Sequence, residues 1–227
     1  MGHLLLTPIL CIETTGAICS AALFDRNQML ASREHLEPNA HAAVLFLLID
    51  EVMKEARIDF PQLKGVAVSK GPGSYTGLRI GVSAAKGICH ATGAALIAVS
   101  TLQLMAISSQ YPAETSAVIP MIDARRNEVY TGIYSPYGEA LQAPHPLILT
   151  PDSCADALEK GVVYFIGNGA TKWQAQCIHP NARFNPDVAP TALQMGELAM
   201  NLYDRQQFED LAYFEPEYVK PVFITGG

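Results

Sequence analysis

The sequence contains the same strand–turn–strand pattern twice, about half the chain apart. The segment "IETTGAICSAALFD" (12–25) aligns with "IDARRNEVYTGIYS" (122–135) at an offset of 110 residues. The acid Glu13 then matches the acid Asp123. Each copy reads as a strand that ends in an acid, a turn and a second strand, and a further strand follows both copies. The pattern predicts an internal duplication, in which each half of the chain builds an equivalent sheet.

Helical segments alternate with these strands. Around the first copy, strands are expected at 64–70 and 95–100, and helices at 40–56 and 76–91. The second half adds a helix, a strand and a final amphipathic helix, which are expected at 151–161, 162–169 and 191–205. This alternation predicts an α/β fold. We expect an N-terminal lobe over 1–101 and a C-terminal lobe over 102–227, with a C-terminal tail that can pack back on the first lobe.

Composition and charge exclude several classes of protein. The chain has 227 residues, 49% of them hydrophobic, and a net charge of -7, which argues against extensive direct contact with RNA or DNA. It contains no apolar run of the roughly 18–20 residues that a membrane helix needs, and its start lacks the features of a signal peptide. Its five cysteines have no CxxC spacing and suggest free thiols in a reducing cytoplasm.

The repeated, acid-ended hairpin resembles the plan of the actin-like fold (the ASKHA or ribonuclease-H-like superfamily), which sugar kinases and Hsp-type chaperones share. The resemblance implies that the two hairpin turns clasp nucleotide phosphates, with Mg²⁺ near the acids. It therefore implies that Glu13 and Asp123 could hold the metal through water, and that Thr14 and Thr15 could contact phosphate. A weakly bound ATP or ADP with Mg²⁺ is the cofactor that this plan would allow.

The glycine-rich stretch "SKGPGSYTGLRIGVSAAKG" (69–87) has two interpretations. It is neither a Walker A loop, because Leu78 stands where that motif has lysine, nor a Rossmann fingerprint. Glycines before a helix still let backbone N–H groups approach an anion. On this interpretation Gly71, Gly73 and Ser74 contact phosphate.

The other interpretation of this stretch is close packing. Gly73, Gly77, Gly81 and Ala85 fall at steps of four and form a ridge with almost no side chain. Glycine inside a helix costs about 1 kcal/mol relative to alanine, so two in consecutive turns indicate that another backbone approaches closely. The ridge predicts tight packing on another helix, either within the chain or across an interface.

The helix at 40–56 favours an interface. Its run "VLFLLI" (44–49) is apolar at six consecutive positions, so both faces need burial near the start of the helix. We expect helices 40–56 and 76–91 to form a helix-bundle interface, while a single compact core that buries every residue stays open as the alternative. The predicted interface residues are His41, Val44, Leu45, Leu48, Tyr75, Gly77, Leu78, Arg79, Gly81 and Ala85.

The glycine stretch, "IETT" near the start, "DARRNEVYTGIY" (123–134) and the tail "YVKPVFIT" (218–225) closely resemble the TsaB (YeaZ) family. The resemblance implies a scaffold subunit in the bacterial synthesis of threonylcarbamoyladenosine, the modified adenosine next to the anticodon of tRNA. It implies pairing with the catalytic subunit TsaD and the ATPase TsaE, a homodimer in isolation, and contact with tRNA only through the complex. An older label for the family is M22 glycoprotease.

The residues give no support to chemistry of the chain's own. No two of the six histidines are four apart, so the H-x-x-x-H metal pair of the catalytic relative is missing, and no metal site or catalytic residue is predicted. Ser74 lacks the G-x-S-x-G elbow of a serine hydrolase. Arg125 and Arg126 occupy a turn that is small and glycine-rich in actin-like ATPases; they could fill a cleft or bind an acidic partner. The alternatives are an ATP-dependent enzyme of the sugar-kinase class and, least favoured, a glycoprotease.

Overall fold

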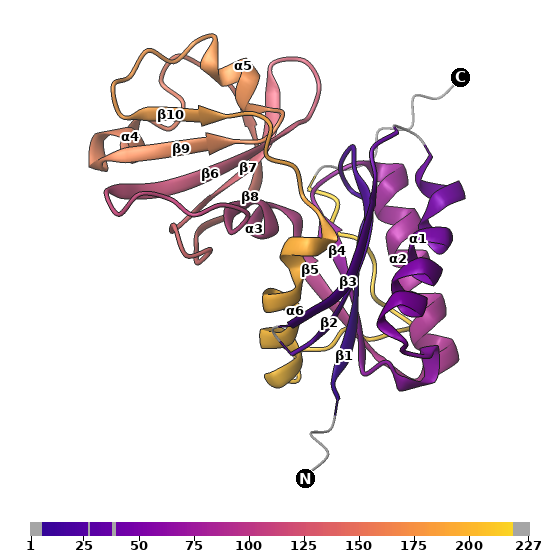
Figure 1. The fold of residues 1–227 in the computed structure, drawn as a ribbon. Coiled ribbons are helices and arrows are strands. Elements are labelled where there is room, and N and C mark those ends of the chain that lie inside the picture. The colour runs from indigo at the N-terminus through magenta and orange to yellow at the C-terminus, as the bar shows by residue number, and fades with distance from the viewer. Residues whose placement is uncertain (1–5, 27, 38–39, 220–227) are drawn as a thin grey trace, which may run out of the picture. The chain divides into compact units, whose positions relative to one another are not determined.

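The computed structural model describes residues 6–26, 28–37 and 40–219. The chain folds into two compact units (Figure 1). Unit 1 comprises the described residues up to Ser100 together with Pro190–Pro216, and unit 2 comprises Thr101–Ala189 with the described residues from Glu217 onward. Among the described residues no helix is long and apolar enough to cross a membrane.

Unit 1 is built on a five-stranded sheet with the order β3-β2-β1-β4-β5. The first three strands pair antiparallel, and β4 and β5 continue the sheet in parallel from β1. β1 and the apolar residues of β2 are buried, which fits a sheet with helices on both faces. The strands span β1 Pro8–Glu13, β2 Cys19–Asp25, β3 Gln28–His35, β4 Gly65–Gly71 and β5 Ala95–Ser100.

Two long helices cover one face of this sheet, and a third helix lies on the other face (Figure 1). α1 (His41–Ala56) contacts β2 and β3, while α2 (Tyr75–Thr92) contacts β4 and β5. On the opposite face α6 (Met195–Asp204) contacts β1 and β5, preceded by a 3-10 turn at Ala192–Gln194; another lies at Phe60–Gln62. The apolar sides of α1 and α2 form one core with the sheet.

Unit 2 repeats the arrangement with smaller helices. Its sheet has the order β10-β9-β6-β7-β8, and hydrophobic clusters lie on both faces. The strands span β6 Thr115–Asp123, β7 Glu128–Tyr134, β8 Ala140–Ile148, β9 Val162–Ile166 and β10 Ala182–Asn185. The helices are α3 Thr101–Ala106, α4 Ala155–Lys160 and α5 Ala170–Gln174.

The two sheets have the same topology. In each, three antiparallel strands are followed by a fourth strand parallel to the first and a fifth parallel to the fourth. Glu13 and Asp123 end the equivalent strands β1 and β6. The predicted α/β, actin-like fold with an internal duplication is confirmed.

The division of the chain differs from the predicted lobes at the C-terminal side. α6 falls within the predicted second lobe, 102–227, yet it packs in unit 1. Its first turn brings Gly196 against Phe24 of β2, so close that a β-carbon on Gly196 would lie 2.4 Å from the ring. Buried Met195, Ala199 and Met200 complete the contact face. The end of the predicted lobe, 220–227, lies outside the described residues.

Candidate functional site

The acid at the end of β1 is enclosed by hydrogen bonds. Glu13 is fully buried, and its Oε1 accepts hydrogen bonds from the Thr15 backbone N at 2.5 Å and the Thr15 hydroxyl at 2.6 Å. Its Oε2 accepts a hydrogen bond from the Ser69 hydroxyl on β4. Both carboxylate oxygens therefore have partners within the fold, and the side chain offers no free face to a metal or a phosphate.

Two opposing effects act on the pKa of Glu13. Burial raises the pKa, because a charged carboxylate loses its solvation, and the hydrogen bonds from Ser69, Thr15 and Thr14 lower it in part. The balance leaves the pKa above its ordinary value. The residue is thus primarily a structural acid that ties the β1–β2 turn to β4.

The glycine ridge of α2 packs on this same turn. A β-carbon on Gly77 would lie 2.0 Å from the backbone oxygen of Thr14, and one on Gly81 would lie 2.4 Å from the Thr14 hydroxyl. A β-carbon on Gly73, just before the helix, would lie 2.6 Å from the β-carbon of Thr15. The close approach predicted from the ridge therefore exists. Its partner is the turn after β1 rather than a second helix.

Hydrogen bonds fasten the turn to the start of α2. The Thr14 hydroxyl donates to the Gly77 carbonyl at 2.7 Å, and the Ser74 backbone N donates to the Thr15 carbonyl at 2.9 Å. Ser74 caps the helix, since its hydroxyl accepts from the Gly77 backbone N. The turn and the helix start form one rigid body.

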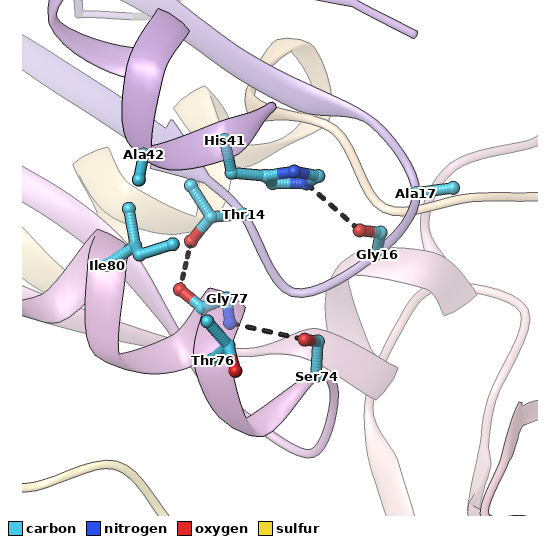
Figure 2. A pocket seen from close by; sticks show the side chains of 9 residues that line it. All are labelled: Thr14, Gly16, Ala17, His41, Ala42, Ser74, Thr76, Gly77 and Ile80. Atoms are coloured by element: carbon cyan, nitrogen blue, oxygen red, sulfur yellow. Dashed lines mark hydrogen bonds between the residues drawn. The ribbon is translucent and has the colours of Figure 1, made fainter. Parts of the chain in front are cut away.

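A pocket of about 360 Å³ opens beside this body (Figure 2). It lies between the β1–β2 turn and the first residues of α1 and α2, and His41 at the start of α1 is held with its Nε2 3.2 Å from the Gly16 carbonyl. Of the predicted nucleotide-site residues, Thr14 and Ser74 line the pocket, while Glu13 and Gly73 contact Thr15 in the adjoining turn. The lining residues are Thr14, Gly16, Ala17, His41, Ala42, Ser74, Thr76, Gly77 and Ile80.

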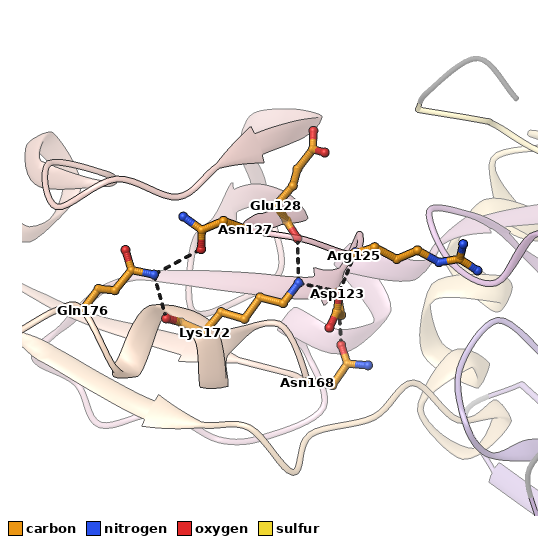
Figure 3. A network of polar contacts seen from close by, with 7 residues as sticks. All are labelled: Asp123, Arg125, Asn127, Glu128, Asn168, Lys172 and Gln176. Atoms are coloured by element: carbon orange, nitrogen blue, oxygen red, sulfur yellow. Dashed lines mark hydrogen bonds and ion pairs between the residues drawn. The ribbon is translucent and has the colours of Figure 1, made fainter. Parts of the chain in front are cut away.

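The acid at the end of β6 is engaged in a different way (Figure 3). Asp123 Oδ1 accepts a hydrogen bond from Lys172 Nζ at 2.6 Å and from the Arg125 backbone N at 2.6 Å. Its own backbone N donates to Asn168 Oδ1 at 2.9 Å. Lys172 also donates to the Glu128 carbonyl. The Lys172 ammonium is thus the direct ion-pair partner of the acid that ends β6.

The charge of Asp123 is stabilised by these neighbours. Partial burial raises its pKa, but the hydrogen bonds from Lys172 and from the Arg125 backbone outweigh it and leave the pKa below its ordinary value. Lys172 lies 49 residues further along the chain. No local sequence pattern predicts that Lys172 is the partner of Asp123.

The predicted interface residues divide into two groups. Val44 is half-buried and only Tyr75 and Arg79 are exposed, with the Arg79 guanidinium 4.2 Å from the Tyr75 ring centre. The remaining predicted interface residues are buried within unit 1, where they face the sheet or the turn after β1. For these residues the predicted interface role needs correction. The buried residues are His41, Leu45, Leu48, Gly77, Leu78, Gly81 and Ala85.

Two large exposed apolar residues of α1 were not among the predicted interface residues. Phe46 is 57% exposed and Leu47 is 62% exposed, although both belong to the run that suggested an interface. A helix advances 100° per residue, so a run of six must place some members on the outer face. Leu45, Leu48 and Ile49 lie on one face of the helix. Assigning the other members of the apolar run to the opposite face would have identified Phe46 and Leu47 as exposed.

A second pocket, which the sequence did not predict, lies in unit 2. It has a volume of about 270 Å³ and lies between the face of β6, β7 and β8 and the segment at α4. In unit 1 the 16-residue α1 covers the equivalent strands, whereas α4 has only six residues and contacts β6 and β9. His145, Asp152 and Cys154 line this pocket, and the described residues contain no group of three His, Cys, Asp or Glu side chains that could hold a metal.

Comparison with known proteins identifies the family. The family model "TsaD: tRNA N6-adenosine threonylcarbamoyltransferase" matches residues 31–215. The "tRNA threonylcarbamoyladenosine biosynthesis protein TsaB" of Haemophilus influenzae is 28% identical over 93% of both chains, and that of Escherichia coli is 26% identical over 93% of this chain and 94% of its own. The chain belongs to this family, and within it to the TsaB (YeaZ) proteins.

Solved structures agree with this membership of the TsaB family. YeaZ from Pseudomonas aeruginosa superimposes with a TM-score of 0.81 at 26% identity, over 93% of this chain and 99% of that one. A protein described as similar to peptidase YEAZ, from the same organism, gives a TM-score of 0.82 at 25% identity, over 94% of this chain and all of that one. Both units of this TsaB-family chain are therefore included in the match.

Proposed function

We propose that this chain is a subunit of the machinery that makes threonylcarbamoyladenosine in tRNA. The observation that carries the proposal is the similarity to TsaB proteins, which runs through both units and is not limited to one motif. The similarity therefore includes the two sheets of equivalent topology. It also includes the region where α2 packs closely on the β1–β2 turn.

Within that machinery we assign the chain a non-catalytic role. Support comes from the two hairpin acids. Both carboxylate oxygens of Glu13 accept hydrogen bonds, from Thr15 and Ser69, and Asp123 is bound by the Lys172 ammonium. The residues present do not fit a Mg²⁺–nucleotide site of the actin-like type. Glu13 is buried and would have to give up its present partners to reach a metal, and the Lys172 ammonium beside Asp123 would repel a cation. We assign no step of the reaction to these residues.

The exposed face of α1 and α2 supports a pairing role. Phe46, Leu47 and Tyr75 present apolar surface to solvent, which is the kind of surface that a protein partner covers. We propose that the catalytic TsaD subunit covers this face in the active complex, and that a second copy of the chain covers it in isolation. TsaE then completes the complex.

Reconstitution tests the role directly. The purified chain is mixed with TsaD, TsaE, threonylcarbamoyl-adenylate, ATP and tRNA, and the modified nucleoside is quantified. We expect modification to fall at least tenfold when the chain is left out. Full modification without it contradicts the proposal, and so does substantial ATP hydrolysis by the isolated chain, which would favour an enzyme of the sugar-kinase class.

A charge on the α1 face tests the pairing surface. Leu47→Asp replaces an exposed apolar side chain, so the fold should survive while co-sedimentation with TsaD and the homodimer are both lost. Ile178→Asp is the matched control, because Ile178 is fully exposed in unit 2 and far from α1 in the sequence. Unchanged association of the Leu47→Asp chain would contradict this surface.

A further inference from the structure

The hairpin turn between β6 and β7 has an unusual backbone. Arg125 and Arg126 both lie in the left-handed region, with φ of 67° and 49°. This region is unfavourable for residues with a β-carbon and is normally given to glycine, asparagine or aspartate. The surrounding structure must therefore hold the two consecutive arginines in this backbone conformation, because arginine itself does not favour it.

A dense set of hydrogen bonds supplies that support (Figure 3). The Arg125 backbone N donates to Asp123 Oδ1, and the Glu128 backbone N donates to the Arg125 carbonyl at 3.2 Å. Lys172 joins Asp123 to the Glu128 carbonyl, and Asn127 Nδ2 donates to the Leu149 carbonyl at 2.7 Å. The base of the turn is therefore rigid, and its tip consists of the two arginines.

The two guanidinium groups are available to a ligand. Both arginines are exposed, and within residues 6–26, 28–37 and 40–219 neither side chain forms an ion pair. Asp123 attracts the Arg125 guanidinium at longer range, but its direct ion-pair partner is Lys172. Two exposed arginines without a direct ion pair thus follow one another on a hydrogen-bonded turn, in a chain whose net charge is -7.

Guanidinium groups bind phosphate with two parallel hydrogen bonds, which makes arginine a preferred residue for phosphates of nucleic acids. We propose that the Arg125–Arg126 turn contacts backbone phosphates of the tRNA substrate. This inference rests on the proposed function, and it goes further because it gives the chain a direct contact with tRNA. The acidic remainder of the chain limits the contact to this turn, so about two phosphates are neutralised.

The test measures tRNA affinity of the reconstituted complex by fluorescence anisotropy over a range of KCl concentrations. Loss of two phosphate contacts in Arg125→Ala/Arg126→Ala should weaken binding at low salt. It should also make the slope of log K against log salt shallower by about 1.4–1.8, since each contact contributes about 0.7–0.9. Arg183→Ala, which removes another exposed arginine of unit 2, is the matched control and should leave the slope unchanged.

A second variant separates binding from folding. Arg125→Gly/Arg126→Gly removes the charges and relieves the left-handed backbone, so its Tm should rise by about 2–4 °C while its tRNA affinity falls as in the alanine variant. Loss of affinity in a chain that is more stable than the wild type cannot come from misfolding.

The contrary outcomes are distinct from failure of the proposed function. If modification requires the chain but both double variants keep the wild-type affinity and salt slope, the arginine turn does not contact tRNA. The inference is also overturned if Arg183→Ala has the same effect, or if the variants lose only ATP binding or only association with TsaD. If modification does not require the chain at all, the proposed function itself fails.

Discussion

The backbone of Gly77 in α2 lies in direct contact with the backbone of Thr14 after β1. A β-carbon on Gly77 would be 2.0 Å from the Thr14 carbonyl oxygen, which is far inside van der Waals contact. The approach also brings the Thr14 hydroxyl to the Gly77 carbonyl at 2.7 Å. The glycine is thus a requirement of the fold of unit 1, and the same holds for Gly81, whose β-carbon would meet the Thr14 hydroxyl.

Gly77→Ala should therefore destabilise the chain strongly. The obstacle is a backbone atom that a rotamer change cannot move, so we expect a loss of about 3 kcal/mol in the free energy of unfolding, at the upper end of overpacking effects. Gly87→Ala is the matched control on the same helix, because nothing lies within 4 Å of its β-carbon position. It should gain about 1 kcal/mol from helix propensity. Urea unfolding of both variants decides the matter, and equal effects at the two positions would refute the interpretation.

This contact shows what the sequence could and could not predict. Spacing alone indicated that Gly77 and Gly81 permit a close approach, because glycine inside a helix is unfavourable without one. It could not identify the partner, since the Thr14–Thr15 turn lies 63 residues from Gly77 and is an irregular segment without periodicity.

The hairpin repeat predicted the fold because it follows from local patterns of strands, turns and acids. The placement of α6 in unit 1 depends on Gly196 fitting against the Phe24 ring, a contact between segments 172 residues apart. The pairing of Asp123 with Lys172 is equally remote from any local pattern. Tertiary packing decides such contacts, and no local sequence pattern reports it.

The buried acid gives a test with a defined sign. The pKa of Glu13 is raised above its ordinary value of 4.5, so the folded state holds the proton more tightly than the unfolded state. The resulting stability is complete below about pH 4.5 and is lost as pH rises through the folded pKa. Glu13→Gln removes this loss. Its free energy of unfolding, relative to the wild type, should rise between pH 4.5 and pH 8. The rise should be about 1.4 kcal/mol for each tenfold difference between the acid dissociation constants of Glu13 in the folded and unfolded states.

Ser69→Ala tests the same linkage in the opposite direction. It removes a hydrogen bond that favours the charged form of Glu13, so its cost should be greater at pH 8 than at pH 4. Urea unfolding at both pH values measures the two variants. Parallel pH profiles for both variants and the wild type would show that Glu13 ionises alike in the folded and unfolded chain.

The Asp123–Lys172 pair should contribute little to stability at neutral pH. The two side chains are 42% and 23% exposed, so solvent screens their attraction, and a double-mutant cycle with Asp123→Asn and Lys172→Gln should give a coupling of at most about 1 kcal/mol. The pKa of Asp123 is lowered, so this contribution is present above its ordinary value of 3.8 and is lost as pH falls through the folded pKa. A coupling that persists at pH 2, or that 1 M salt does not reduce, would contradict an electrostatic origin.

The segment after α6 is held to unit 1 by Lys86. Its Nζ donates to the Ala212 and Phe214 carbonyls at 3.3 and 3.0 Å, while Leu211 and Phe214 pack against the core. Lys86→Met keeps most of the apolar stem and removes both bonds, so amide exchange in this segment should accelerate about tenfold, the equivalent of 1.4 kcal/mol. Exchange measured by mass spectrometry over 209–216 tests this against Lys54→Met, whose ammonium pairs with Asp50 on the same helix. Unchanged protection in the Lys86 variant would mean that apolar packing and the backbone bond from Glu209 to Leu96 hold the segment without Lys86.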